Sequence, residues 1–147
     1  MRKEMRLRGE EGSTLLLTIF YGFLALVLVL LVSAATSLYL ERKRLFTLAD
    51  GAALVGAEAF DLERVTMTPG GPRPVLDSSA VAAAVNDYLA QTPTSEFDSL
   101  EVLRAETVDG RSATVSLGAY WSPPVLSLLV PDGFPIEVTA LARSVFD

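Results

Sequence analysis

Residues 15–40, LLLTIFYGFLALVLVLLVSAATSLYL, contain no charged side chain, and this run constrains the fold more than any other part of the sequence. A helix needs about 20 predominantly apolar residues to cross the hydrocarbon core of a bilayer. The apolar residues fall on every side of such a helix, with no polar stripe, so it would face lipid or other apolar helices all round. The sequence therefore predicts a transmembrane helix over 15–40, preceded by a short basic leader over 1–14.

This run has three alternative interpretations. Four basic residues in the first eight positions and the small residues 33–35 are typical of a secretory signal, which would leave a mature N-terminus near Thr36. A buried core helix is a second alternative. However, the apolar stretch before residue 33 is longer than a signal core of about 7–15 residues. It also ends in Glu41–Arg44 (ERKR), which resembles a stop-transfer flank. We therefore favour a retained membrane anchor.

Charge is distributed unevenly along the chain. Residues 1–44 hold seven Lys/Arg and four acids, a net of +3, and residues 45–147 hold five and fourteen, a net of −9, consistent with the total of −6. The acidic part argues against nucleic acid as a partner, because phosphate binding needs positive charge. Lys/Arg counts on the two sides of the run are nearly equal, so the positive-inside rule barely decides the orientation. We expect the basic leader in the cytoplasm and the acidic part outside the membrane.

The segment after the run is rich in alanine and glycine, and we expect the membrane helix to continue through it as an extension over 41–63. At helical spacing one face of this extension collects apolar and small side chains. The predicted helix-packing stripe consists of Leu45, Leu48, Ala49, Ala52, Ala53, Gly56, Ala59 and Phe60. Its small-xxx-small spacing favours close helix contacts. Two uses stay open: packing on a helix of another subunit, or packing on the chain's own C-terminal domain. Thr47, Asp50 and Glu58 fall on the opposite side.

Residues 64–147 are predicted to form a small extracytoplasmic α+β domain. Three prolines and two glycines within 66–76 end the long helix. Residues 77–79 offer an N-cap for a short helix over 80–90. The apolar period then changes to two, which predicts strands near 100–105, over 112–121 and over 136–146, with a hairpin turn at 108–111. Residues 125–130 are a short apolar piece, either a helical turn or a binding loop. The predicted fold class is α+β: the long membrane helix with its extension, one short helix, and a three-stranded antiparallel sheet.

Catalytic chemistry has little support in the sequence. The chain has no cysteine and no histidine, which excludes disulfides, thiol catalysis and the usual general base near neutral pH. Serine, threonine and tyrosine side chains therefore lack a histidine to activate them. We identified no catalytic residue, no cofactor site and no metal-ligand cluster, and we expect the protein not to be an enzyme.

The segment 48–57, LADGAALVGA, resembles the signature of the TadE/TadG-like proteins of tight-adherence (Flp) pilus systems, with Asp50 at the position of the signature acid. The Arg8–Gly12 segment before the run and the charged exit after it are also similar to that family. The resemblance implies a membrane-anchored, minor pilin-like or accessory subunit whose partners are other pilin or assembly subunits and membrane platform proteins. We hypothesise that Asp50 meets a charge or an amide of such a partner, the alternative being a solvated residue or local cap.

The same resemblance implies processing by a prepilin peptidase between Gly12 and Ser13. TadE-type members carry a glutamate five residues after the cleaved glycine, whereas here Leu17 occupies that place, and cleavage after Gly9 would put Thr14 there. This departure favours a TadG-like or divergent member that stays as an anchor or initiates assembly. The competing hypothesis is a single-span protein that presents an extracytoplasmic binding domain unrelated to pili.

Overall fold

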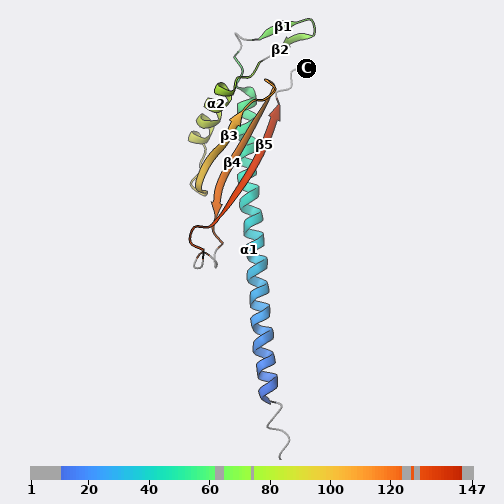
Figure 1. The fold of residues 1–147 in the computed structure, drawn as a ribbon, viewed down its shortest axis with the longest axis vertical. Helices are drawn as coiled ribbons and strands as arrows, with labels where there is room; N and C mark the ends of the chain where they lie inside the picture. The colour runs from blue at the N-terminus through green and yellow to red at the C-terminus, as the bar shows by residue number, and fades with distance from the viewer. Residues whose placement is uncertain (1–10, 62–64, 74, 124–126, 128–129, 144–147) are drawn as a thin grey trace, which may run out of the picture. The chain divides into compact units, whose positions relative to one another are not determined.

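The computed structural model describes residues 11–61, 65–73, 75–123, 127 and 130–143. It begins with one long helix, α1 (Glu11–Glu58), which is 48 residues long (Figure 1). The charged exit, Glu41–Arg44, lies inside this helix and does not interrupt it. The predicted continuation of the apolar helix into the alanine-rich segment is therefore confirmed, although the helix ends at Glu58 rather than near residue 63.

The chain divides into two compact units, Met1–Ser37 and Leu38–Asp147. The first unit contains the N-terminal part of α1. In it, the hydroxyl groups of Thr18 and Thr36 donate to the carbonyl oxygens of Thr14 and Val32, both at 2.9 Å. These bonds satisfy the hydroxyls within the helix itself, which is how a threonine is accommodated where no water is present.

The second unit contains the C-terminal part of α1, a short helix and two antiparallel sheets. The elements after α1 are β1 (Thr66–Thr68), β2 (Gly71–Arg73), α2 (Ser78–Gln91), β3 (Asp98–Glu106), β4 (Ser112–Trp121) and β5 (Phe134–Arg143). The main sheet has the order β3-β4-β5, with all neighbours antiparallel. The predicted α+β class, with one short helix and a three-stranded sheet, is thus confirmed.

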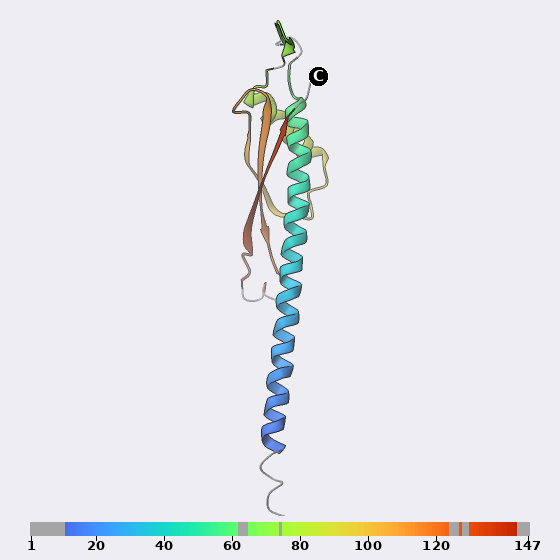
Figure 2. The same ribbon diagram turned by 90° about the vertical axis from the view of Figure 1, so that its right-hand side faces the viewer.

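The hydrophobic core of this unit lies between the sheet and the two helices, which cover the same sheet face (Figure 2). Alternate residues of β4 point inward, as a period of two requires. The core side chains of β4 and β5 are Ala113, Val115, Leu117, Ala119, Val138, Ala140 and Ala142. Val81 and Val85 of α2 and the apolar face of α1 complete the core. The helix extension is therefore an integral part of the domain and supplies one wall of its core.

The strands and α2 agree with the predicted pattern, with instructive differences. Strand β4 has the predicted bounds, while β5 begins two residues earlier than expected and is described only to Arg143. Strand β3 begins at Asp98, and its register shifts between Val102 and Arg104. This irregularity accounts for Leu103, which falls out of the alternating pattern and packs on Gly118 of β4. Most of the segment 125–130 lies outside the described residues.

Two local features add detail that the sequence did not predict. Residues 66–76 follow the end of the long helix, as predicted, and they also contain the short hairpin β1–β2, whose turn lies at residues 69–70. Gly71, the first residue of β2, has a φ of 109°. Helix α2 begins at Ser78, and the carboxylate of its N-cap residue, Asp77, makes no capping bond to the backbone. It accepts a 2.7 Å bond from the Ser79 hydroxyl.

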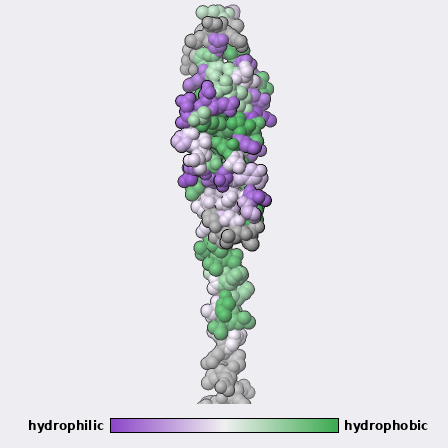
Figure 3. Space-filling model, turned by 90° about the vertical axis from the view of Figure 1, so that its left-hand side faces the viewer, coloured by the Kyte–Doolittle hydropathy of each residue, from purple (hydrophilic) through white to green (hydrophobic). Residues whose placement is uncertain are grey.

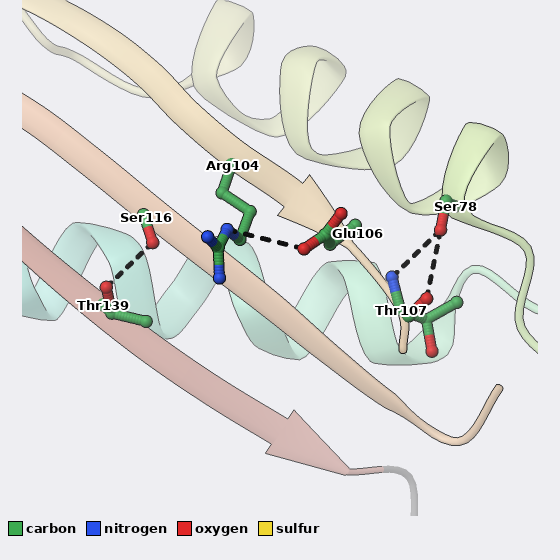
Figure 4. A network of polar contacts seen from close by, with 6 residues as sticks. All are labelled: Ser78, Arg104, Glu106, Thr107, Ser116 and Thr139. Atoms are coloured by element: carbon green, nitrogen blue, oxygen red, sulfur yellow. Dashed lines mark hydrogen bonds and ion pairs between the residues drawn. The ribbon is translucent and has the colours of Figure 1, made fainter. Parts of the chain in front are cut away.

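Side-chain hydrogen bonds link α2 to the segment after β3, and β4 to β5 (Figure 4). The Ser78 hydroxyl donates to the carbonyl oxygen of Thr107 and accepts from its backbone N–H, both at 3.2 Å. These two bonds tie the start of α2 to the end of β3. On the sheet face turned away from the core, the hydroxyls of Ser116 and Thr139 lie 2.8 Å apart and link β4 to β5.

Candidate functional site

The predicted helix-packing stripe is buried inside the domain. Leu45, Ala49, Ala52 and Ala53 have no exposed surface, and Leu48 and Gly56 are also buried. Ala59 and Phe60 lie just beyond the end of α1 and are half-buried, with Phe60 packed against the core. Of the two uses that the sequence left open, the structure shows the intramolecular one. These side chains face the chain's own sheet and α2, so they are not exposed to a second subunit.

Two glycines of α1 show why the stripe is built from small residues. A Cβ at Gly56 would lie 3.1 Å from Val81 Cγ1 and 3.2 Å from Ala113 Cβ, so α2 and β4 both press on this position. A Cβ at Gly51 would collide with the hydroxyl of Tyr88. Glycine costs about 1 kcal/mol relative to alanine in a helix. Close packing against α2 and the sheet offsets that cost here.

The opposite side of α1, which we call the outer face, is solvent-exposed and consists of Thr47, Asp50, Leu54 and Glu58. Among the described residues, no ion pair or side-chain hydrogen bond involves the Asp50 carboxylate, so it is neither a local cap nor part of a salt bridge. Leu54 is 52% exposed and lies one helical turn after Asp50. The sequence analysis missed Leu54 as a surface residue. Its position on the helical wheel, opposite Leu45 and Ala52, was the signal that would have found it.

Large apolar side chains are exposed along residues 15–32 of α1. They include Leu16, Phe20, Phe23, Leu28 and Leu31. This is the one helix among the described residues that is long and apolar enough to cross a membrane. In the space-filling view the N-terminal part of α1 is almost uniformly apolar, whereas the surface of the second unit mixes hydrophilic and apolar side chains (Figure 3). A surface of this kind is typical of a segment that lies in lipid or against other apolar helices.

The predicted processing site lies at the start of α1. Gly12 and Ser13 are both exposed and helical, and a Cβ at Gly12 would meet no atom within 4 Å. The structure therefore gives Gly12 no packing role. Cleavage by a prepilin peptidase between Gly12 and Ser13 stays a prediction.

The β3–β4 turn carries the clearest electrostatic feature of the domain. The Asp109 carboxylate accepts bonds from the backbone N–H groups of Ser112 at 2.7 Å and Arg111 at 2.9 Å, and from the Ser112 hydroxyl at 2.9 Å. These bonds, first of all that from the Ser112 backbone, lower the pKa of Asp109 to about 2. They hold the turn closed, and Gly110 adopts the left-handed conformation with a φ of 67°. The Asp109 carboxylate therefore stabilises the β3–β4 turn.

Within the residues that the structure describes, no group of three or more acidic side chains is arranged to hold a metal ion. Two surfaces of α1 are available for contacts with other molecules: its exposed apolar part and its outer face.

Comparison with known proteins supports an assignment for α1. Residues 12–59 match a family model described as "Putative Flp pilus-assembly TadE/G-like". The match confirms the resemblance that the signature around Asp50 suggested, and its bounds nearly coincide with those of α1. No curated protein and no solved structure matches the chain.

Proposed function

We propose that this chain is a membrane-anchored accessory or minor pilin-like subunit of a Tad (Flp) pilus or a related type IV pilus-like assembly system, with no enzymatic activity. The observation that carries the proposal is the coincidence between the family match, residues 12–59, and helix α1, Glu11–Glu58. The matched part of the chain is helix α1 itself. We therefore expect the function of the protein to depend on the contacts that α1 makes.

The N-terminal part of α1 serves as the anchor in this proposal. Its exposed apolar side chains suit lipid or the apolar helices of other subunits. The basic leader lies in the cytoplasm and the acidic domain outside. Because a leucine occupies the place of the pilin-type glutamate, the subunit remains an anchor or initiates assembly.

Contacts with other subunits outside the membrane use the outer face of α1, since the small-residue stripe is already occupied by the domain core. Asp50 and Leu54 offer an unpaired charge and an exposed apolar side chain one turn apart. A partner helix or loop that carries an amide or a cation beside an apolar side chain would match this pair. Association would remove about half of the Leu54 surface from water.

A piliation assay tests this proposal. In cells that depend on this chain for pili, Leu54→Arg and Asp50→Ala are expected to lower the number of pili while the protein stays at normal membrane levels. Leu141→Arg is the matched control, because Leu141 is 67% exposed and lies outside the family match. An unchanged number of pili in both outer-face variants would contradict the proposed contact. Normal pili without the chain would remove the pilus role and favour the alternative of a single-span protein with a separate binding domain.

Intact-mass measurement of the native protein tests the anchor. A full-length mass is expected for a retained anchor, and loss of residues 1–12 would show processing at Gly12. A mass that corresponds to a chain beginning near Thr36 would contradict membrane anchoring and identify a secreted domain.

A further inference from the structure

Aromatic side chains gather where β4 ends and β5 begins. Trp121, the last residue of β4, pairs in register with Phe134, the first residue of β5, and their ring centroids lie 6.1 Å apart. Trp121 is half-buried, and Phe134 and Tyr120 are exposed. The connection between the two strands, residues 122–133, contains a single charged residue, Asp132. We call Tyr120, Trp121 and Phe134 the aromatic end of the sheet.

Two contacts show how β5 runs beside α1 in the second unit. A Cβ at Gly56 of α1 would lie 3.2 Å from Ala113, which pairs with Ala142 near the end of β5. Earlier in β5, Val138 lines an open groove together with α1 residues from the segment 39–46. Strand β5 therefore runs in the same direction as α1, as Figures 1 and 2 also show. The start of β5 lies at the end of the unit from which α1 leads back into the charge-free run.

The level of Phe134 along α1 follows from these contacts. Phe134 lies four residues before Val138, which is about 13 Å along a strand. The same length of an α-helix holds about nine residues. Counted back from Phe46, the last α1 residue of the groove, this distance leads to about Leu38, which belongs to the charge-free run. The aromatic end of the sheet thus lies beside the last residues of that run.

The burial of α1 agrees with this level. Leu38 and Glu41 share the side of the helix that carries the buried Leu45, since they precede it by seven and four residues. Both are half-buried, whereas Tyr39 and Leu40 on the other sides are exposed. The second unit therefore covers one side of α1 down to Leu38, inside the charge-free run.

If α1 is the anchor, as proposed above, this level is the membrane–water interface. The run 15–40 is longer than the about 20 residues that cross the hydrocarbon core, so its last residues reach the headgroup layer. Tryptophan and tyrosine are enriched at this depth, because their rings are apolar while their N–H or O–H group can bond to water or lipid. Arg42 and Lys43 are exposed within one turn of the run, where cations suit lipid phosphates.

We infer that the aromatic end of the sheet is inserted in the headgroup layer of the same bilayer that holds α1. Its position selects a lipid surface as the occupant, because this end lies beside the part of α1 that emerges from the bilayer. Asp132 can stay hydrated in the headgroup layer. The domain is then attached to the membrane at two places, α1 and the aromatic end, and these two attachments fix its tilt.

The test uses Trp121 itself, which is the single tryptophan of the chain. The full-length chain is inserted, one copy per disc, into nanodiscs of phosphatidylcholine whose acyl chains are brominated near the headgroup. Bromine quenches tryptophan fluorescence on contact, and iodide does so from the water on both faces of a disc. Relative to unbrominated discs, Trp121 is expected to lose about half of its fluorescence, since an indole at the interface touches the first carbons of the chains. Iodide should quench it weakly.

Two tryptophans at other levels serve as controls, each placed in a Trp121→Phe background. Leu40→Trp marks the end of the charge-free run, and Leu141→Trp lies seven residues after Phe134, about 23 Å further along β5. Both leucines are exposed. Leu40→Trp should be quenched by bromine as Trp121 is, whereas Leu141→Trp should be quenched by iodide and not by bromine. Unfolding curves followed by circular dichroism verify that each variant is folded.

The outcomes separate this inference from the anchor. Bromine quenching of Leu40→Trp without quenching of Trp121 would overturn the inference and leave the anchor intact. Protection of Trp121 from both quenchers would also overturn it, because protein instead of lipid would then cover the ring. Equal bromine quenching of Trp121 and Leu141→Trp would show that the membrane does not select this end of the sheet. If bromine quenches neither Leu40→Trp nor Trp121, the anchor is contradicted as well.

Discussion

The N-terminal part of helix α1 exposes its apolar side chains, whereas the C-terminal part buries most of them. Residues 15–32 expose large side chains such as Leu16 and Phe23, whereas residues 45–57 bury small ones such as Ala49 and Ala53. In the first part no described element of its own unit packs on the helix, and its exposed apolar surface is typical of a segment that lies in lipid or against other apolar helices. In the second part a sheet and a helix come so close that even glycine is needed. The same secondary structure therefore presents an exposed apolar surface in one segment and supplies a core element in the next.

The strongest test of this comparison uses two leucines of α1 that differ in burial. Leu45 has no exposed surface, whereas Leu54 is 52% exposed. Leu45→Ala should lower the free energy of unfolding of the domain by about 2–5 kcal/mol, because it leaves a cavity in the core. Leu54→Ala should change it by less than about 0.5 kcal/mol. Chemical unfolding of the full chain in detergent micelles, followed by Trp121 fluorescence, measures both, and equal effects would contradict the assignment of faces.

A second test enlarges a residue of the buried stripe. Gly56→Val should destabilise the domain by about 1–3 kcal/mol, because the new side chain must enter space held by Val81 and Ala113. Gly22→Val in the apolar part of α1 is the control, since a Cβ there would meet no atom within 4 Å. If both substitutions leave the unfolding curve unchanged, the tight contact at Gly56 does not exist in solution.

A third test separates the two glycines of α1 that α2 approaches, Gly51 and Gly56. A Cβ at Gly51 would meet only the far end of the Tyr88 side chain, which can rotate away. Gly51→Ala is therefore expected to be neutral or to stabilise the domain by up to about 1 kcal/mol through helix propensity. Combining it with Tyr88→Phe, which removes the obstructing hydroxyl, should make the gain larger. A loss in the double variant would show that the ring itself fills the space over Gly51.

The smallest expected effect concerns pH. Since the folded-state pKa of Asp109 is lowered from 3.8 to about 2, its contribution to stability is complete above pH 4 and is lost as the pH falls toward 2. Asp109→Asn should therefore destabilise the domain at neutral pH, and the difference from the wild type should shrink between pH 4 and pH 2. Unfolding midpoints across this range measure it. A difference that is independent of pH would show that the charge of Asp109 does not hold the turn.

Much of the fold could be predicted because its signals are local. The charge-free run, the alternation in residues 112–121 and the Asp109–Gly110 turn each depend on neighbours within a few positions. The β1–β2 hairpin was missed because its strands are only three residues long and contain a proline. The register shift around Leu103 was visible in sequence only as a residue out of phase. Leu103 packs on Gly118, which lies on another strand, so this contact could not be predicted from neighbouring residues.

The sequence by itself determined which residues of α1 face one side, because helical periodicity assigns Leu45, Ala52 and Gly56 to one stripe whatever they contact. It also determined the length of the apolar run and the resemblance of the segment around Asp50 to the TadE/TadG-like signature. Only the tertiary structure decided what covers that stripe. Small side chains admit any close neighbour, and the chain's own sheet and α2 occupy the position that another subunit's helix would otherwise fill.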